Sequence, residues 1–307
     1  MKTLNFKTLL TATVATVSTV VVAAQSAQAF SFTKLDTDWH IVQDSFKDGT
    51  DSVLGANSNF EMFGMAAKIE NGQAYFVFNG NLGRDKHDGV GQGDLFFNFT
   101  DKSFKDASAA EELFAVHFAP NDAGNGPMGY GLYENVKAKS VTKWNKGHPG
   151  FLSYRNFVAN KGGTVGFGDF TPQEAQKYFT EFDGGYQDGG HSIQNVIETG
   201  TKVADDGFEF FTDADPELAG LDFGTSDPAI YSKAKTFGFK FDVSKLPEGD
   251  ALITLLHECI NDGMAMAAKF EAPGGIGNVD VPEPTSIVSL GLIGLALAGS
   301  KLRKQNF

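Results

Sequence analysis

Thr236-Phe237-Gly238-Phe239-Lys240-Phe241-Asp242-Val243 is the stretch that decides the fold. Successive side chains of a β-strand point to opposite faces of the sheet, so the three phenylalanines fall on one face. Gly238 and Lys240 fall on the other. The stretch therefore predicts a strand with one face packed in a core.

Similar aromatic and β-branched runs recur along the chain, separated by turns rich in Gly, Asn and Asp. The strongest strand candidates are residues 39–46, 61–69, 74–78, 94–100, 114–118, 131–142, 208–212, 251–258 and 264–270. Asn261-Asp262-Gly263 between the last two predicts a hairpin. The fold class is all-β, and we expect a single β-sandwich of jelly-roll type with a few short helical insertions.

Helix signals are few and local. Thr171-Pro172-Gln173-Glu174 has the spacing of a capping box with proline in the first helical position, and aromatic residues then follow at helical spacing up to Phe182. Shorter helices are expected at residues 151–158 and at Asp215-Pro216-Glu217.

The first 29 residues have the three parts of a secretory signal peptide. Lys2 and Lys7 precede an apolar run, and Ala27-Gln28-Ala29 forms a small-residue site for signal peptidase, which we expect to cut after Ala29. A buried N-terminal helix is the alternative, but six Thr and Ser between residues 8 and 19 make a poor core face. We therefore expect a helical signal segment and export of the protein.

The last residues, 281–307, also have three parts. Pro282-Glu283-Pro284 holds the chain extended, an uncharged run covers residues 287–300, and the basic residues Lys301, Arg303 and Lys304 follow. The uncharged run has 14 residues, fewer than the ~20 that cross a membrane comfortably. A run this short favours a tail that stays in the membrane only until it is processed. A permanent membrane anchor is the alternative.

This tail resembles the PEP-CTERM sorting signal, which exosortase proteases of exopolysaccharide-producing Gram-negative bacteria recognise. The resemblance implies that Pro282-Glu283-Pro284 marks the processing region. It also implies that a hydrophobic C-terminal helix holds the protein in the inner membrane until exosortase acts. Delivery to the cell surface or the medium, with exopolysaccharide as a possible partner, would follow.

The middle of the chain is similar to a cyanobacterial group of exosortase-dependent surface proteins. The segments that prompt this are Trp39-His40, Asp44-Ser45-Phe46, residues 93–99, residues 237–241 and residues 258–263. The group has no catalytic residues that the resemblance carries over.

Composition limits what residues 30–280 can bind. The chain holds 25 basic and 38 acidic residues; its ends contain five of the former and one of the latter, which leaves residues 30–280 a formal net charge of −17. Such a domain repels phosphate backbones and anionic lipid, so nucleic acid is excluded as a partner. Its length suits one domain.

The acidic loops are the segments whose residues most suggest a binding site. Asp213, Asp215 and Glu217 stand at alternate positions and are the candidate ligands of a structural Ca²⁺, which takes carboxylate, carbonyl and water oxygens. Asp215 can instead cap a helix before Pro216. No EF-hand loop is present.

Catalytic motifs are lacking: Cys259 is the single cysteine, the six histidines are scattered without a zinc-protease spacing, and no G-x-S-x-G occurs. We therefore expect a non-enzymatic surface or matrix protein. The alternative is a secreted carbohydrate-binding module or glycoside hydrolase, because paired carboxylates leave no local signature. The candidate sugar-stacking rings are Tyr130, Tyr133, Trp144, Tyr154 and Tyr186.

Overall fold

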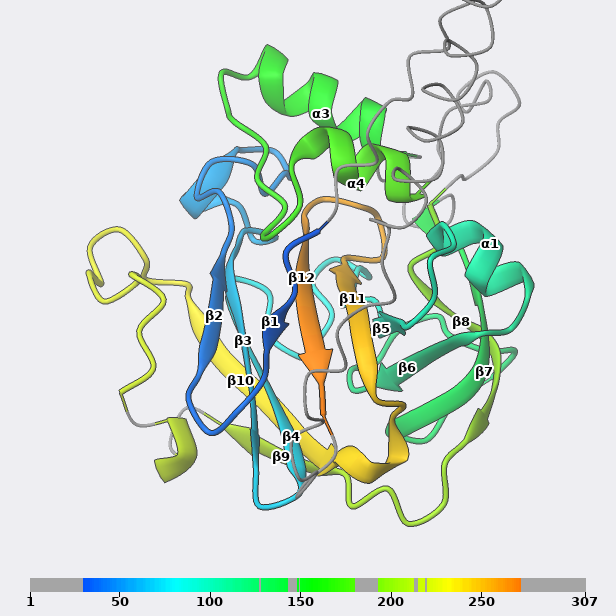
Figure 1. Ribbon diagram of the computed structural model, residues 1–307. Coiled ribbons are helices and arrows are strands. Elements are labelled where there is room, and N and C mark those ends of the chain that lie inside the picture. Colours follow the sequence, from blue (N-terminus) through cyan, green and yellow to red (C-terminus); the bar gives the residue numbers. More distant parts are fainter. Residues whose placement is uncertain are drawn as a thin grey trace, which may run out of the picture. The chain divides into compact units, whose positions relative to one another are not determined.

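The computed structural model describes residues 30–126, 128–142, 148, 150–179, 193–212, 215–218 and 220–271 (Figure 1). Contacts divide the chain after Ser31, and the description below concerns the unit that begins at Phe32. The predicted signal helix and C-terminal helix lie outside the described residues. Among the helices that are described, none combines the length and apolar character needed to cross a membrane.

Two β-sheets face each other. The larger has seven strands in the order β1-β12-β11-β5-β6-β7-β8, and the smaller has five in the order β2-β3-β4-β10-β9. Neighbouring strands are antiparallel, except that β1 pairs with β12 in parallel. The strands are β1 (Thr33–Lys34), β2 (His40–Gln43), β3 (Met62–Glu70), β4 (Gln73–Gly80), β5 (Leu95–Asn98), β6 (Leu113–His117), β7 (Gly131–Lys139), β8 (Val196–Lys202), β9 (Glu209–Thr212), β10 (Lys235–Asp242), β11 (Gly249–Leu256) and β12 (Gly263–Phe270).

The all-β prediction is confirmed, and each strand expected from the alternation is present. Two further strands were not predicted: β1 has only two residues, and most of β8 is exposed and polar. The hairpin between β11 and β12 is confirmed, with Leu256 opposite Gly263. A jelly-roll connectivity is not confirmed, because β5 to β8 follow one another within one sheet, whereas jelly rolls alternate between sheets.

The core lies between the sheets and is built largely from phenylalanine. Phe237, Phe239 and Phe241 of β10 point into it, as their alternation predicts. Phe76 of β4 stacks on Phe241 at 6.0 Å in its own sheet and meets Phe97 of β5 edge-on at 5.3 Å across the sandwich. Such edge-to-face and offset pairs add about 0.5–1.5 kcal/mol each beyond area burial.

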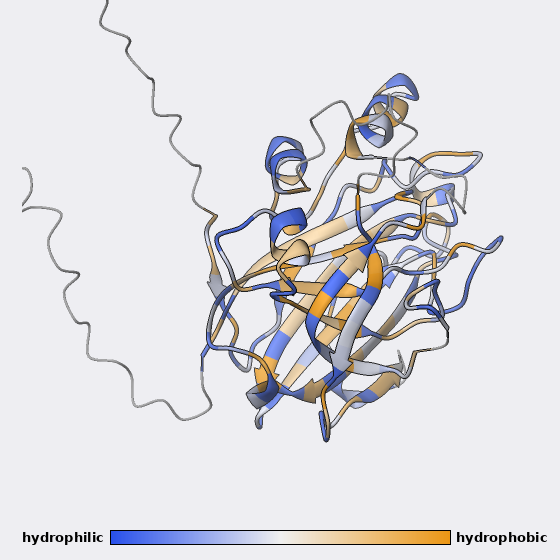
Figure 2. Ribbon diagram, turned by 90° about the vertical axis from the view of Figure 1, so that its right-hand side faces the viewer, coloured by the Kyte–Doolittle hydropathy of each residue, from blue (hydrophilic) through white to orange (hydrophobic). Residues whose placement is uncertain are grey.

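Helices and loops cover the outer faces. The helix α1 (Phe104–Ala109) places Phe104 edge-on against Phe96 of β5. Phe179 of α4 (Pro172–Phe179) packs against the ring of Phe104. On the smaller sheet, Ala66 and Val77 are covered by Phe223 and by Leu218, which ends the 3-10 helix η2 (Pro216–Leu218). Figure 2 shows the apolar residues concentrated in the strands and the polar ones in loops and helices.

The three helices predicted from sequence are present. The helix α4 begins with the expected capping box, in which Glu174 N donates to Thr171 Oγ1 and Thr171 N donates to Glu174 Oε2. The helix α3 (Phe151–Asn160) and η2 are the other two, while α1, capped by Ser103, was not predicted. Figure 1 shows α3 and α4 beside one end of the sheets, where β2 ends and β12 begins. The remaining 3-10 helices are η1 (Gly55–Asn57) and η3 (Val243–Lys245).

Candidate functional site

Four acidic side chains converge at the end of the sandwich beside α3. Asp44 follows β2, Glu61 precedes β3, Asp262 precedes β12, and Asp48 lies in the loop after β2. Asp48, Glu61 and Asp262 are completely buried and Asp44 is 8% exposed. We call these four residues the carboxylate cluster.

The cluster is compact. One carboxylate oxygen from each of Asp44, Asp48 and Asp262 lies within 4.8 Å of the other two. Glu61 belongs to the same cluster, because it is close enough to Asp262 for the charge of that residue to raise the pKa of Glu61. In the described part of the chain, no lysine or arginine forms an ion pair with any of the four.

Asp262 is held by three donors. Met62 N donates to Oδ2 at 2.7 Å, and Gly263 N donates to Oδ1 at 2.8 Å. The Tyr154 hydroxyl, from α3, donates to Oδ1 at 3.0 Å. The carboxylate therefore joins the starts of β3 and β12 to the helix that covers them.

Backbone amides donate to both Asp48 and Glu61. Gly166 N donates to Asp48 Oδ2 at 2.7 Å, and Gly49 N donates to Glu61 Oε2 at 2.6 Å. A Cβ atom on Gly166 would lie 2.5 Å from Asp44 Oδ1, so only glycine allows the backbone this close. The loops are shaped around the carboxylates.

Several oxygens of the cluster lack any donor among the described residues. They are both oxygens of Asp44, Oδ1 of Asp48 and Oε1 of Glu61. A protonated Asp44 can donate to Asp262, whereas an ionised Asp44 has only the Ser45 backbone amide beside it, which lowers its pKa by less than burial raises it. Burying an ionised carboxylate without a partner costs far more than a hydrogen bond returns. The cluster therefore requires a neutralising species.

The pKa values express this requirement. Burial, followed by repulsion from Asp262, raises the pKa of Asp44 and of Asp48 well above the ordinary range. The same two causes raise the pKa of Glu61 to about 9. Burial also raises the pKa of Asp262, but the donors from Met62, Gly263 and Tyr154 limit it to about 7. Without a cation, protons are what neutralise the site at neutral pH.

The raised pKa values predict that the stability of the protein depends on pH when a chelator removes metal ions. Glu61 has a pKa of 4.5 when unfolded and about 9 when folded, so the folded protein holds the proton more tightly. Its contribution is fully present below pH 4.5 and is lost toward pH 9, at about 1.4 kcal/mol per pH unit. We expect the free energy of unfolding in urea to fall over this range, and to fall less steeply in Glu61→Gln. Equal slopes for the two proteins would contradict the prediction.

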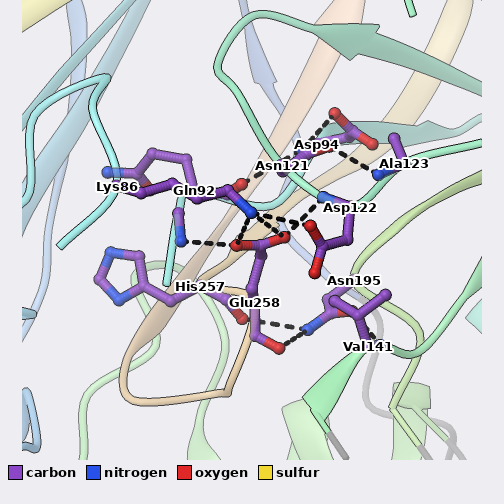
Figure 3. A network of polar contacts seen from close by, with 11 residues as sticks. Lys86, Gln92, Asp94, Asn121, Asp122, Ala123, Val141, Asn195, His257 and Glu258 are labelled. Carbon is purple, nitrogen blue, oxygen red and sulfur yellow. Dashed lines mark hydrogen bonds and ion pairs between the residues drawn. The ribbon is translucent and has the colours of Figure 1, made fainter. Parts of the chain in front are cut away.

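A second buried polar network is centred on Glu258 (Figure 3). The Glu258 side chain is 0% exposed and accepts from Gly91 N and Asp122 N, both at 2.6 Å, with Lys86 Nζ at 3.2 Å. Asn195 Nδ2 donates to the Glu258 carbonyl at 2.7 Å. These contacts join four loops.

His257 and Asp94 belong to the same region. Burial lowers the pKa of His257 to about 3, and neither of its ring nitrogens has a described partner, so it is a neutral core residue. Asp94 accepts from Ile197 N at 2.7 Å and from Asn121 Nδ2 at 2.9 Å, and contacts His117 Nδ1 at 2.8 Å.

His117 borders an open pocket of about 460 Å³. The ring of Tyr130, 38% exposed, stacks on His117 with centroids 5.4 Å apart. The Arg84 guanidinium lies over the rings of Tyr130 and Phe210. The pocket is lined by His117, Pro120, Asn121, Asp122, Ala123, Gly124, Gly126, Met128 and Tyr130, which include no serine, threonine or cysteine nucleophile.

The end of the chain outside the described residues is identified by comparison. A protein-family model, the PEP-CTERM protein-sorting motif, matches residues 280–305. The chain carries a PEP-CTERM sorting tail. Searches of the curated proteins and of the solved structures give no match.

The PEP-CTERM tail contains the predicted processing residues Pro282, Glu283 and Pro284 and the basic residues Lys301, Arg303 and Lys304. Its match supports an exosortase-sorted protein that is exported to the cell surface through a membrane-anchored intermediate. The tail and the predicted signal site at Ala27 and Ala29 lie outside the described residues.

The calcium ligands predicted from sequence are only partly described. Asp213 lies outside the described residues, and Glu217 Oε1 lies 3.5 Å from Lys240 Nζ in an ion pair. Asp215 precedes η2, whose Leu218 N donates to the Asp215 carbonyl. Among the described residues, the acidic groups that come within metal-binding distance of one another are in the carboxylate cluster instead.

The predicted sugar-stacking rings are scattered. Tyr154 is buried and its hydroxyl donates to Asp262. Tyr133 is buried and its hydroxyl donates to the Gly129 carbonyl. Tyr130 borders the pocket. Trp144 and Tyr186 lie outside the described residues.

Proposed function

We propose that this chain is a non-enzymatic surface or extracellular-matrix protein of the cyanobacterial PEP-CTERM type. The observation that carries the proposal is the sorting motif at residues 280–305, only a few residues after β12 ends at Phe270. The signal peptide directs export and signal peptidase cuts after Ala29, while the tail holds the domain at the inner membrane. Exosortase then cuts near Pro282-Glu283-Pro284 and hands the domain to the exopolysaccharide-rich envelope or to the medium.

The engagement of the buried polar groups supports a structural role. Glu258 accepts from backbone amides of two other loops and Asp94 accepts from a backbone amide of β8, so both carboxylates fix neighbouring segments. The phenylalanine core between two broad sheets suits a domain that must persist outside the cell.

The test is the C-terminus of the mature protein. The chain is expressed with and without an exosortase, and the product is analysed by intact-mass spectrometry. We expect a species that has lost residues 301–307 only when exosortase is present. Replacement of Pro282-Glu283-Pro284 by three alanines should abolish that species. Replacement of Pro273-Gly274 by two alanines is the matched control and should leave the species unchanged. An intact end at Phe307 in every case would refute the proposal.

A second candidate is a glycan-binding module, and the pocket beside Tyr130 is the observation that favours it. An exposed aromatic ring flanked by amide and carboxylate groups suits a neutral sugar, with stacking as the main contact. We expect Tyr130→Ala to lose binding on a glycan array while Trp39→Ala, a half-buried ring beside the other sheet, keeps it. If wild-type protein binds no glycan, this candidate fails.

A further inference from the structure

We propose that the carboxylate cluster of Asp44, Asp48, Glu61 and Asp262 is a binding site for one Ca²⁺ ion, with Asp44, Asp48 and Asp262 as ligands. The site goes beyond the sorting function and does not depend on it. It also differs from the acidic run at residues 213–217 that the sequence favours.

The spacing of the carboxylate oxygens fits one Ca²⁺ ion. Two oxygens bound to the same Ca²⁺ each lie about 2.3–2.6 Å from it, so they are separated by at most about 5 Å. One oxygen of each of Asp44, Asp48 and Asp262 meets that limit, at no more than 4.8 Å from the others. Side chains from two segments distant in sequence, the loop after β2 and the start of β12, therefore already bring three carboxylates within reach of one ion.

Several buried oxygens of the cluster have no hydrogen-bond partner among the described residues. Both oxygens of Asp44 and Oδ1 of Asp48 are buried and have no described partner, although buried polar atoms are almost always satisfied. The other oxygen of Asp48 and both oxygens of Asp262 accept from backbone amides. The protein thus supplies hydrogen bonds to some oxygens of the cluster and leaves others available to a cation.

The chemical type of the ligand atoms favours a hard cation. The ligands are carboxylates alone, which suit hard cations rather than zinc or copper. Mg²⁺ is usually held by one or two carboxylates and keeps several waters, whereas Ca²⁺ accepts several carboxylates in a flexible geometry. With no basic residue paired to the cluster in the described chain, a divalent cation supplies the missing positive charge.

Such an ion would hold together the end of the sandwich. It joins the loop after β2 to the start of β12, positions more than 200 residues apart in sequence. Asp262 extends the link to α3 through Tyr154, and Asp48 extends it to the loop at Gly166. Calcium binding should therefore stabilise the whole domain, because the site exists only when these segments are folded together.

The test uses the full chain, exported by its own signal and purified with and without EDTA, with CaCl₂ as the probe. Calorimetric titration should show one site, and Ca²⁺ at about a hundred times its Kd should raise the Tm by about 5–10 °C. Asp88→Asn is the matched control, since the Asp88 side chain is 88% exposed, and it should respond like the wild type. Asp48→Asn should lose the Ca²⁺ response.

Asp44→Asn gives a test that does not rely on loss of function. In EDTA it removes a buried unpartnered acid, so its Tm should equal or exceed that of the wild type. In Ca²⁺ the order should reverse, because the variant has lost a ligand. The same order in both conditions, no calcium binding by the wild type, or a stronger response to Zn²⁺ than to Ca²⁺ would overturn the proposal.

Discussion

Asp262→Ala should cost the domain on the order of 4 kcal/mol of unfolding free energy. The change leaves three buried donors, Met62 N, Gly263 N and the Tyr154 hydroxyl, without an acceptor. Each such loss costs about 1–3 kcal/mol, and the removal of a buried acid offsets part of the sum. Urea unfolding in EDTA measures the effect without any contribution from a cation.

Asp262→Asn provides the comparison. It keeps one acceptor oxygen for Gly263 and Tyr154 but presents an amide NH₂ to Met62 N, so an intermediate loss is expected. If Asp262→Ala lies within about 0.5 kcal/mol of the wild type, the carboxylate does not organise the end of the sandwich.

Phe76→Ala should have a comparable effect from a different cause. The ring is 0% exposed and contacts Phe97 across the sandwich and Phe239 and Phe241 within its sheet. Truncation of a fully buried phenylalanine leaves a cavity and costs about 3–5 kcal/mol. The loss should be the same in calcium and in EDTA, because the ring does not touch the carboxylate cluster.

The control for this prediction is Ile230→Ala. Ile230 is 53% exposed, and its truncation should change the unfolding free energy by no more than about 0.5 kcal/mol. Equal effects of the two substitutions would mean that the aromatic core is not what holds the sheets together.

The strands could be predicted from sequence because their signal is local. The alternation of Phe237, Phe239 and Phe241 is visible within five residues, and the structure buries all three. The capping box at Thr171 and the hairpin before Gly263 are local in the same way. By contrast, β8 was missed because Gly200, Thr201 and its other exposed residues show no apolar face. The order of strands in the sheets also has no local signature.

The candidate site could not be predicted because its residues are distant in sequence. Asp44 and Asp262 stand at the end of one apolar run and the start of another, and each looks like ordinary turn chemistry. The alternating acids from Asp213 to Glu217 gave a more visible pattern, yet Glu217 pairs with Lys240. A usable signal was available: acidic residues directly flank three apolar strands, at Asp44, Glu61 and Asp262.

A crystal structure of the exported protein grown in CaCl₂, with anomalous difference maps, tests the calcium site most directly. The account predicts one anomalous peak among Asp44, Asp48 and Asp262, about 2.3–2.6 Å from an oxygen of each. Carboxyl groups hydrogen-bonded to one another around an empty centre, with no anomalous peak, would contradict it.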